Sequence, residues 1–352
     1  MPYRFKIDEP VEKGFRRIAR EQLDVALAEL AAPEIRPGGV HECRKALKRM
    51  RALVRLVGPA LGNDKAKKRT KALSEAARLL AGRRDQAVLL DTVAKLTSET
   101  GVDGALTLAP LKAHFAQTFG EAPQSLDPDS AAKARMLLLR EAKKFAHMRL
   151  RQRGFAAIED GLEKSYRRAR KALKIAYSEP SDETFHTLRK AVQWHWRQMS
   201  LLARAWPDKF AVRVAAAREL SQILGDDHDL AMLIGATASA KDLSDEQKDA
   251  IVGLCERRQQ GLRTAAENRA ERLFAEAPKA FVKRMSAYWK FGRIVPLSDV
   301  VPKAWVAEAQ PAPPQPVSHP DHQPSAPDGK QTPAKPRLAV KAAASAPSQR
   351  RA

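Results

Sequence analysis

The stretch HECRKALKRMRALVRLV, residues 41–57, carries a basic stripe and an apolar stripe at helical spacing. Positions separated by three, four and seven residues share one face of an α-helix. The basic residues at this spacing are His41, Arg44, Lys45 and Lys48, and Arg51 and Arg55 extend their stripe. The apolar residues behind it predict packing against neighbouring helices; they are Cys43, Leu47, Met50, Val54 and Val57.

The pattern returns 145 residues later, in HTLRKAVQWHWRQMSLL at 186–202. Here His186, Arg189 and Lys190 keep the spacing, Gln193 takes the fourth position, and Arg197 and Arg204 extend the stripe. A second pair of segments, 77–90 and 219–234, places Asp85 opposite Asp229. These matches predict an internal duplication into two pseudo-symmetric helical bundles, with halves at about 1–135 and 136–296. A basic groove between two such halves would suit a long ligand.

Three more segments repeat the basic spacing, and acidic residues are largely missing from the stripes themselves. The segments contribute Lys13, Arg16, Arg17 and Arg20, then Arg140, Lys143, Lys144 and His147, and finally Lys164, Arg167, Arg168 and Lys171. Like charges four residues apart destabilise a helix by roughly 0.2–0.5 kcal/mol per pair. A bound polyanion would offset that repulsion at several stripes together, although any single stripe can be a solvated surface.

The composition indicates a helical protein with a polyanionic partner. The chain has 352 residues, with 63 Lys and Arg against 41 Asp and Glu, for a formal net charge of +22. It has no apolar run long enough for a transmembrane helix and no signal-peptide core at its N-terminus, so we expect the cytoplasm. Ala, Leu, Arg, Lys and Glu dominate residues 1–296, where we expect about ten helices and no sheet. Two cysteines give neither a disulfide framework nor a zinc cluster.

The composition changes near residue 297. Of the 23 prolines, 11 lie beyond residue 300, and such a segment cannot bury a core. We therefore expect residues 297–352 to form a disordered tail rich in Pro and Ala. The tail has a net charge of +3, which leaves most of the positive charge in the folded part.

The paired His-led stripes resemble the signatures of CHAD domains, a family named for a conserved-histidine α-helical fold. The stretches FRRIAREQLDVALAEL at 15–30, YRRARKAL at 166–173 and LSQILGDDHD at 220–229 fit the family too. The resemblance covers about 1–296 and implies two helical bundles around a groove that binds inorganic polyphosphate, at polyphosphate granules. The resemblance also implies which residues contact the ligand: His41, Arg44, Lys45, Lys48, Arg49 and Arg51, and then His186, Arg189 and Lys190. The second copy departs from the family pattern at Gln193, Trp194 and Trp196, so it could grip the ligand more weakly.

Two other segments suggest different chemistry. The run Asp226-Asp227-His228-Asp229 has metal-binding residue types, but a phosphohydrolase of this kind needs a further His and Asp on facing helices. Because Asp85 and Asp229 each stand between a turn signal and an apolar run, we interpret both as helix N-caps. Trp194-His195-Trp196 could stack on nucleobases, although packing is the simpler role. His114 and His195 lie outside the stripes and are interpreted as structural or surface residues.

The sequence therefore predicts an all-α, duplicated binder of inorganic polyphosphate that is not an enzyme. It has no GxxxxGK[ST] phosphate loop and no GxSxG or CxxC motif, and we expect no cofactor, no metal and no membrane partner. Two alternatives stay open. One is sequence-nonspecific RNA or DNA binding, for which charge alone would suffice. A polyphosphate binder with this charge could also bind nucleic acids weakly. The other is a metal-dependent phosphohydrolase that uses the acidic run.

Overall fold

The expected all-α class is confirmed. The computed structural model describes residues 3–32, 37–80, 84–119 and 126–294, and within these ranges it has ten α-helices, one 3-10 turn and no strand. None of the described helices combines the length and apolar character that a membrane crossing requires. The predicted disordered tail, 297–352, lies outside the described residues. The internal duplication and its two halves stay a prediction.

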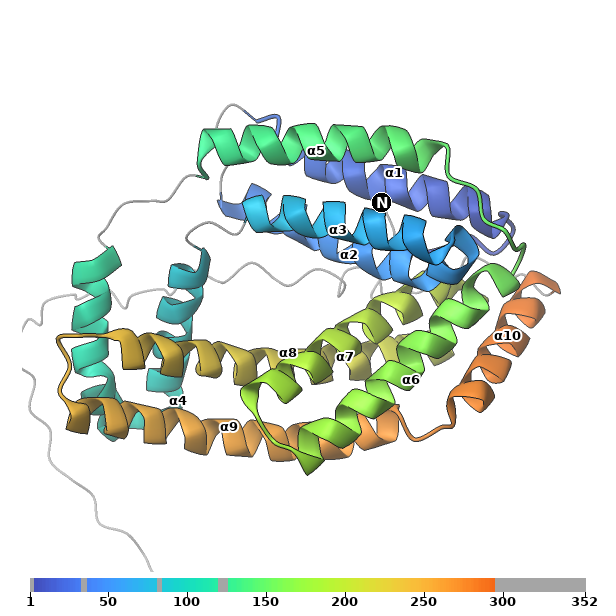
Figure 1. Cartoon of the computed structure of the whole chain (residues 1–352). Helices are drawn as coiled ribbons and strands as arrows, with labels where there is room; N and C mark the ends of the chain where they lie inside the picture. The colour runs from blue at the N-terminus through green and yellow to red at the C-terminus, as the bar shows by residue number, and fades with distance from the viewer. Residues whose placement is uncertain (1–2, 33–36, 81–83, 120–125, 295–352) are drawn as a thin grey trace, which may run out of the picture. The chain divides into compact units, whose positions relative to one another are not determined.

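Four helices form the first group, and each packs on two others in a ring (Figure 1). Helix α1 contacts α2, α2 contacts α3, α3 contacts α5, and α5 contacts α1. Their apolar faces share one core with α6 and α7. The helices are α1 (Val11–Glu29), α2 (Pro37–Leu61), α3 (Asn63–Leu79) and α5 (Pro128–Ala146).

The second group runs from α6 to α10, and consecutive helices from α6 to α9 pack side by side. Helix α10 lies on α6 and on the 3-10 turn, whereas α4 crosses α8 and α9 at the far end of that pair (Figure 1). Gly101, at φ 66°, breaks α4 into two helical pieces. The bounds are α4 (Arg84–Phe119), α6 (Ala156–Ser178), α7 (Asp182–Leu202), η1 (Ala203–Ala205), α8 (Pro207–Ser239), α9 (Asp245–Leu273) and α10 (Pro278–Ile294).

Helix α2 joins the two groups, because it packs on α6 and α7 as well as on α1 and α3. The contact with α6 is backbone to backbone. A Cβ atom placed on Gly161 of α6 would lie 1.8 Å from the carbonyl oxygen of Leu56 on α2, so only glycine allows this approach. Ile158 and Leu162, which flank Gly161 on α6, are fully buried in the core shared by both groups.

Candidate functional site

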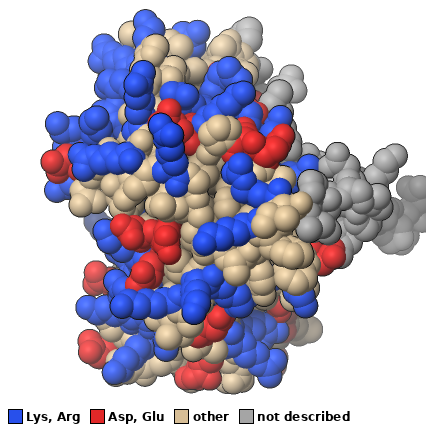
Figure 2. Space-filling model, turned by 90° about the vertical axis from the view of Figure 1, so that its right-hand side faces the viewer, with Lys and Arg blue, Asp and Glu red and all other residues tan. Residues whose placement is uncertain are grey.

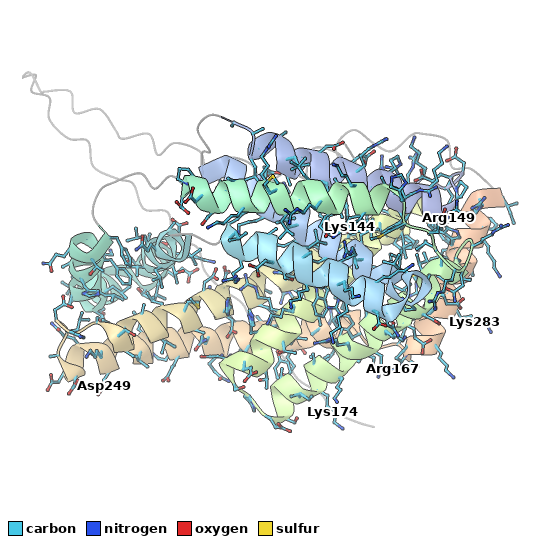
Figure 3. The ribbon with its side chains drawn as sticks, turned by 45° about the horizontal axis from the view of Figure 1, so that its top comes forward. Lys144, Arg149, Arg167, Lys174, Asp249 and Lys283 are labelled. Carbon is cyan, nitrogen blue, oxygen red and sulfur yellow. The ribbon has the colours of Figure 1, made fainter. Side chains whose placement is uncertain are left out.

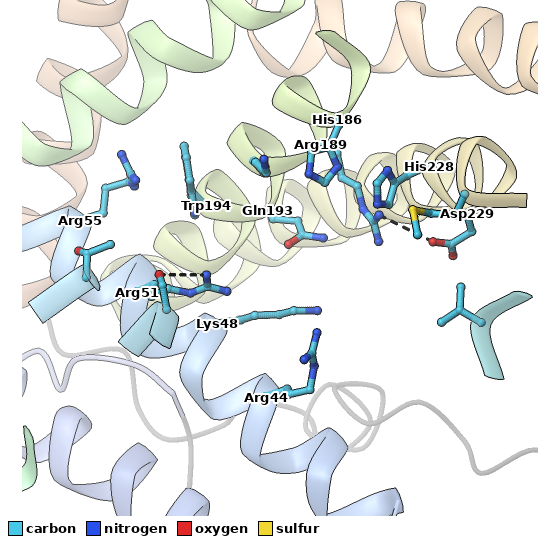
Figure 4. Close-up of a pocket in the computed structure, with 15 residues that line it drawn as sticks. Arg44, Lys48, Arg51, Arg55, His186, Arg189, Gln193, Trp194, His228 and Asp229 are labelled. Atoms are coloured by element: carbon cyan, nitrogen blue, oxygen red, sulfur yellow. Dashed lines mark hydrogen bonds and ion pairs between the residues drawn. The ribbon is translucent and has the colours of Figure 1, made fainter. Parts of the chain in front are cut away.

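A pocket of about 410 Å³ lies between α2 and α7, with α3, α4 and α8 completing its wall (Figure 4). Helix α2 contributes four basic side chains and α7 contributes the stripe that begins at His186. The lining residues from α2 are Arg44, Lys48, Arg51 and Arg55, and those from α7 are His186, Arg189, Lys190, Gln193 and Trp194. The other elements supply Thr70, Ser74, Val88, His228, Asp229 and Met232.

The charge in this pocket is strongly unbalanced. Six of the described lining residues are Lys or Arg, and one, Asp229, is a carboxylate. Asp229 lies 3.8 Å from Arg189 in an ion pair. Like charges gathered around one pocket repel one another, and this repulsion favours an anionic ligand.

Helical geometry explains why four side chains of α2 reach the pocket together. Positions 44, 48, 51 and 55 follow one another at intervals of four, three and four residues, which keeps them on one face. The opposite face is fully buried at Leu47, Met50, Val54 and Val57. Because that apolar face fixes the rotation of the helix, the basic face must point into the pocket.

Two of these arginines are held by α3. Arg44 donates from Nη1 to the carbonyl oxygens of Ala77 at 3.1 Å and Leu80 at 3.2 Å, at the C-terminal end of α3. The last carbonyls of a helix have no N–H partner further along it, and Arg44 supplies donors at this end of α3. Arg51 reaches Ser74 Oγ at 3.5 Å. The two side chains are therefore oriented before any ligand arrives.

On the opposite wall, His186 stacks on His228 with ring centroids 4.2 Å apart. A capping box begins α7 just before this point: Ser181 Oγ accepts from the backbone N–H of Thr184 at 3.2 Å, and Thr184 Oγ1 accepts from that of Ser181 at 3.0 Å. The Nδ1 atom of His186 is buried and has no hydrogen-bond partner among the described residues. This atom can take a proton, and the ring would then carry a positive charge beside the pocket.

The two imidazoles are uncharged at neutral pH. Burial, followed by the positive charge of Arg189, lowers the pKa of His228 to about 4. Burial also lowers the pKa of His186, with a smaller contribution from Lys190. A bound anion would favour the protonated rings, since it supplies the opposite charge that the pocket lacks.

At the other end of the pocket, Trp194 lies between helices α2 and α6. The guanidinium carbon of Arg55 stands 3.6 Å from its ring centroid, and that of Arg168 stands 5.1 Å away. Burial and the charges of Arg168 and Arg51 lower the pKa of Arg55 to about 10, so the side chain stays cationic at neutral pH. Trp194 and Trp196 both pack against the main core, and Trp196, which is not among the described lining residues, has Arg197 over its ring at 4.8 Å.

Several residues of the two His-led stripes do not line this pocket. Lys45 forms an ion pair with Glu42 at 3.0 Å, and Arg49 donates to Gln22 at 3.3 Å on the side of α1. Arg197 is buried and donates to the backbone of its own helix, and Arg204 lies in η1. His41 is exposed in the first turns of α2, outside the described lining.

The three other basic stripes also lie outside the described lining. On α1, Lys13 and Arg20 are exposed, whereas Arg16 pairs with Glu12 at 3.1 Å and Arg17 pairs with Glu9 and Glu21. The exposed members on α5 are Arg140, Lys143, Lys144 and His147, and those on α6 are Lys164, Arg167, Arg168 and Lys171 (Figure 3 marks Lys144 and Arg167). Lys144 pairs with Glu141 and Arg167 with Glu163. Carboxylates at neighbouring positions outside the stripes therefore neutralise part of this charge.

Positive charge is also widespread on the surface. Figure 2 shows Lys and Arg distributed over one face of the molecule from end to end, with Asp and Glu in smaller groups among them. What distinguishes the pocket is the convergence of basic residues from two helices that are far apart in the sequence.

The acidic run 226–229 is not a helix start, and the N-cap interpretation of Asp229 is wrong. Helix α8 continues unbroken from Pro207 to Ser239, because burial of apolar residues such as Leu224, Leu230 and Leu233 outweighs the cost of Gly225. Gly225 leaves space for Arg189, whose Nη2 would lie 3.7 Å from a Cβ at that position. Asp85 lies near the start of α4, within residues whose side chains the structure does not describe.

Consecutive residues on a helix point in different directions, and the four members of this run diverge accordingly. Asp226 pairs with Lys95 at 2.5 Å, Asp227 pairs with Arg263 at 2.7 Å, and the other two face the pocket. Within the described ranges, no group of three or more His, Cys, Asp or Glu side chains could hold a metal ion. The three carboxylates of this run therefore pair with three different cations and do not converge on one site.

Sequence reasoning did not assign His228, Thr70, Ser74 or Met232 to a binding site. His228 was noticed only as part of the acidic run. Thr70 and Ser74 are four residues apart on α3 and carry no charge, so their side of the helix had no distinguishing signal.

Comparisons with known proteins agree with this fold. No curated protein matches the chain. Among solved structures, PptA from Streptomyces chartreusis is similar, with 15% sequence identity and a TM-score of 0.50 over 76% of this chain and 100% of that one. At that identity the likeness shows the fold alone. The family model of the CHAD domain matches residues 17–238, from α1 to the end of α8 and including both pocket walls. Because this match covers more than half of the sequence, the chain belongs to the CHAD domain family.

Proposed function

We propose that this protein binds inorganic polyphosphate in the pocket between α2 and α7. One observation carries the proposal: basic stripes from two distant parts of the sequence converge there, with six Lys and Arg against one carboxylate among the described lining residues. Such an arrangement favours a ligand with closely spaced negative charges. A single phosphate would use few of these cations, whereas a chain of phosphates can use them together.

The donors suit a ligand that consists of phosphate alone. Arg offers paired N–H groups to phosphate oxygens and Lys offers a compact charge. His186 and His228 can each gain a proton beside the anion and so add charge when the ligand is bound. The one tryptophan among the described lining residues, Trp194, already has Arg55 against its ring, which reduces its use for stacking on a base.

The proposed role is binding without catalysis. Phosphoryl transfer needs a positioned nucleophile and nearly always metal ions held by carboxylates that converge. Asp226 and Asp227 are occupied by Lys95 and Arg263, and Asp229 faces Arg189. Cations that hold the ground state of the phosphate chain give affinity without turnover.

A long polymer can bind many copies of such a protein, and each copy presents further exposed cations outside the pocket. We therefore propose that the protein associates with polyphosphate granules in the cytoplasm. The exposed stripes on α1, α5 and α6 would add a nonspecific electrostatic contribution that is sensitive to salt. Weak binding to nucleic acids would follow from the same contribution.

The test is a competition titration of long-chain polyphosphate against single-stranded RNA of equal total charge, at about 0.15 M salt. We expect polyphosphate to displace RNA at a lower concentration, and the preference to disappear in a Lys48→Gln, Arg189→Gln variant. Equal or tighter RNA binding by the unmodified protein would favour the nucleic-acid function instead. A Lys45→Gln, Arg167→Gln variant is the matched control, since it removes two cations that lie outside the described lining.

A further inference from the structure

The contact between Trp194 and two arginines links the pocket to the outer surface of α6. Arg55 belongs to the pocket lining, whereas Arg168 is exposed and lies outside the described lining. Both guanidinium groups approach the same indole ring, at 3.6 Å and 5.1 Å from its centroid. Three helices therefore meet at this point: α2 with Arg55, α7 with Trp194 and α6 with Arg168.

Two positive charges lie near this ring, and their repulsion makes it less favourable for both guanidinium groups to be charged at once. The charge of Arg168 contributes to lowering the pKa of Arg55. An indole ring attracts a cation at its face, and this attraction partly offsets the repulsion. A phosphate chain that passes this ring would offset it more fully, because its oxygens can accept hydrogen bonds from both guanidinium groups.

Arg168 also belongs to a basic face that leads away from the pocket. Lys164, Arg168 and Lys171 are four and three residues apart, so they share one face of α6, and all three are exposed. Arg167 lies one position away from Arg168, about 100° around the helix, and pairs with Glu163. Only one side of the α6 stripe is therefore continuous with the Trp194 contact.

We propose that Trp194 is a positioning residue that holds Arg55 and Arg168 as a pair, and that a polyphosphate chain leaves the pocket over this pair onto the Lys164–Lys171 face of α6. This inference rests on the proposed function, and it adds the direction of the chain and a basis for length preference. Only chains long enough to fill the pocket and pass Trp194 gain the contacts on α6.

The length of the pocket sets how long a polyphosphate chain must be to reach α6. Arg44 and Arg55 are eleven residues apart on α2, a distance of about 16 Å along the helix axis. Figure 4 shows Arg44, Lys48 and Arg189 grouped in one part of the pocket, with Arg55 and Trp194 at the other end. A tripolyphosphate ion is shorter than this distance, and it takes the part where the cations are densest. A long chain fills both ends.

The experiment compares tripolyphosphate and long-chain polyphosphate as ligands of the full-length protein. The variants are Arg168→Gln and the matched control Arg167→Gln, which removes the same charge from the neighbouring position. We expect Arg168→Gln to weaken long-chain binding about threefold to tenfold and to reduce the slope of log affinity against log salt by about one. We expect less than a twofold effect on tripolyphosphate, and the same for the control with both ligands. Equal losses in the two variants, or an equal loss with both ligands, would overturn the proposal.

The role of Trp194 is tested by a double-mutant cycle. If Trp194 positions Arg168, then Arg168→Gln has little further effect on long-chain binding in a Trp194→Leu background. Additive losses would show that the two residues act independently and would contradict the positioning role. Tripolyphosphate binding and the far-UV circular dichroism spectrum report whether Trp194→Leu still folds, and the Arg168→Gln comparison stands without that variant. Failure of the unmodified protein to bind either ligand would instead refute the proposed function.

Discussion

Replacing Lys48 with Gln removes one charge from the pocket without adding a new one. Lys48 lies on the α2 face that lines the pocket and extends toward the α7 wall (Figure 4). A unit charge 4 Å from a phosphate contributes about 1 kcal/mol in water and about 4 kcal/mol near a protein surface. Because the pocket opens to solvent, we take the lower part of that range, about 1–2 kcal/mol. This corresponds to a loss of about 5-fold to 30-fold in polyphosphate affinity.

The matched control is Lys45→Gln, three residues earlier on the same helix. It changes the net charge by the same amount, but Lys45 pairs with Glu42 and is not among the described lining residues. We expect less than a twofold loss from this control. Affinity is measured by titration with long-chain polyphosphate at several salt concentrations, and the slope of log affinity against log salt should fall by about one for Lys48→Gln only.

The comparison is valid if both variants keep the helical circular dichroism spectrum and the melting temperature of the unmodified protein. Equal losses for Lys45 and Lys48 would mean that binding depends on total surface charge, and the assignment of the pocket would then be wrong.

Four further predictions concern pH, packing, catalysis and the tail. Because burial holds the pKa of His228 near 4 in the folded protein, against an ordinary value of 6.5, protonation favours the unfolded chain as pH falls from 6.5 toward 4. Between pH 7.5 and pH 5, the free energy of unfolding without ligand should drop by about 1 kcal/mol more in the unmodified protein than in His228→Gln, after allowance for the partial exposure of the ring. Equal drops in the two proteins would contradict the lowered pKa of His228. Gly161→Ala should lower the free energy of unfolding by about 3 kcal/mol, as measured by denaturant titration. The control is Gly235→Ala in α8, where nothing lies within 4 Å of the added Cβ, and it should be neutral or stabilising. Purified protein should release no phosphate from polyphosphate or ATP with Mg²⁺, Mn²⁺ or Zn²⁺, and metal-dependent release that disappears in an Asp226→Ala, His228→Ala variant would establish an enzyme. Deleting residues 301–352 should leave the melting temperature and the polyphosphate affinity nearly unchanged, because a segment so rich in proline buries little, and a tenfold loss of affinity would place the tail in the binding site.

Features that depend on helix geometry alone could be predicted from the sequence. The basic spacing at 41–55 identified α2, its buried face and the four side chains that line the pocket. It could not separate Arg44 from Lys45, since both are basic and differ only by a rotation about the helix axis. Tertiary and local contacts make the difference: the C-terminal carbonyls of α3 bind Arg44, which lines the pocket, and Glu42 binds Lys45, which does not.

Features that depend on tertiary contacts were missed or misinterpreted. Gly225 followed by acidic residues is a local signal for a helix start, yet buried leucines on both sides keep α8 continuous. This continuity brings His228 against His186, which lies 42 residues earlier on α7. No spacing rule within one helix could have revealed that contact, because it depends on how α7 and α8 pack.

The close approach at Gly161 limits how the pocket can respond to a ligand. At Gly161 the α6 backbone touches the carbonyl of Leu56 on α2, so at this point no side chain lies between the two helices. Helix α6 also packs along α7, so it contacts both of the helices that carry the basic walls. The two walls should therefore resist moving apart beside this contact, so that a ligand must fit the space that the pocket already offers.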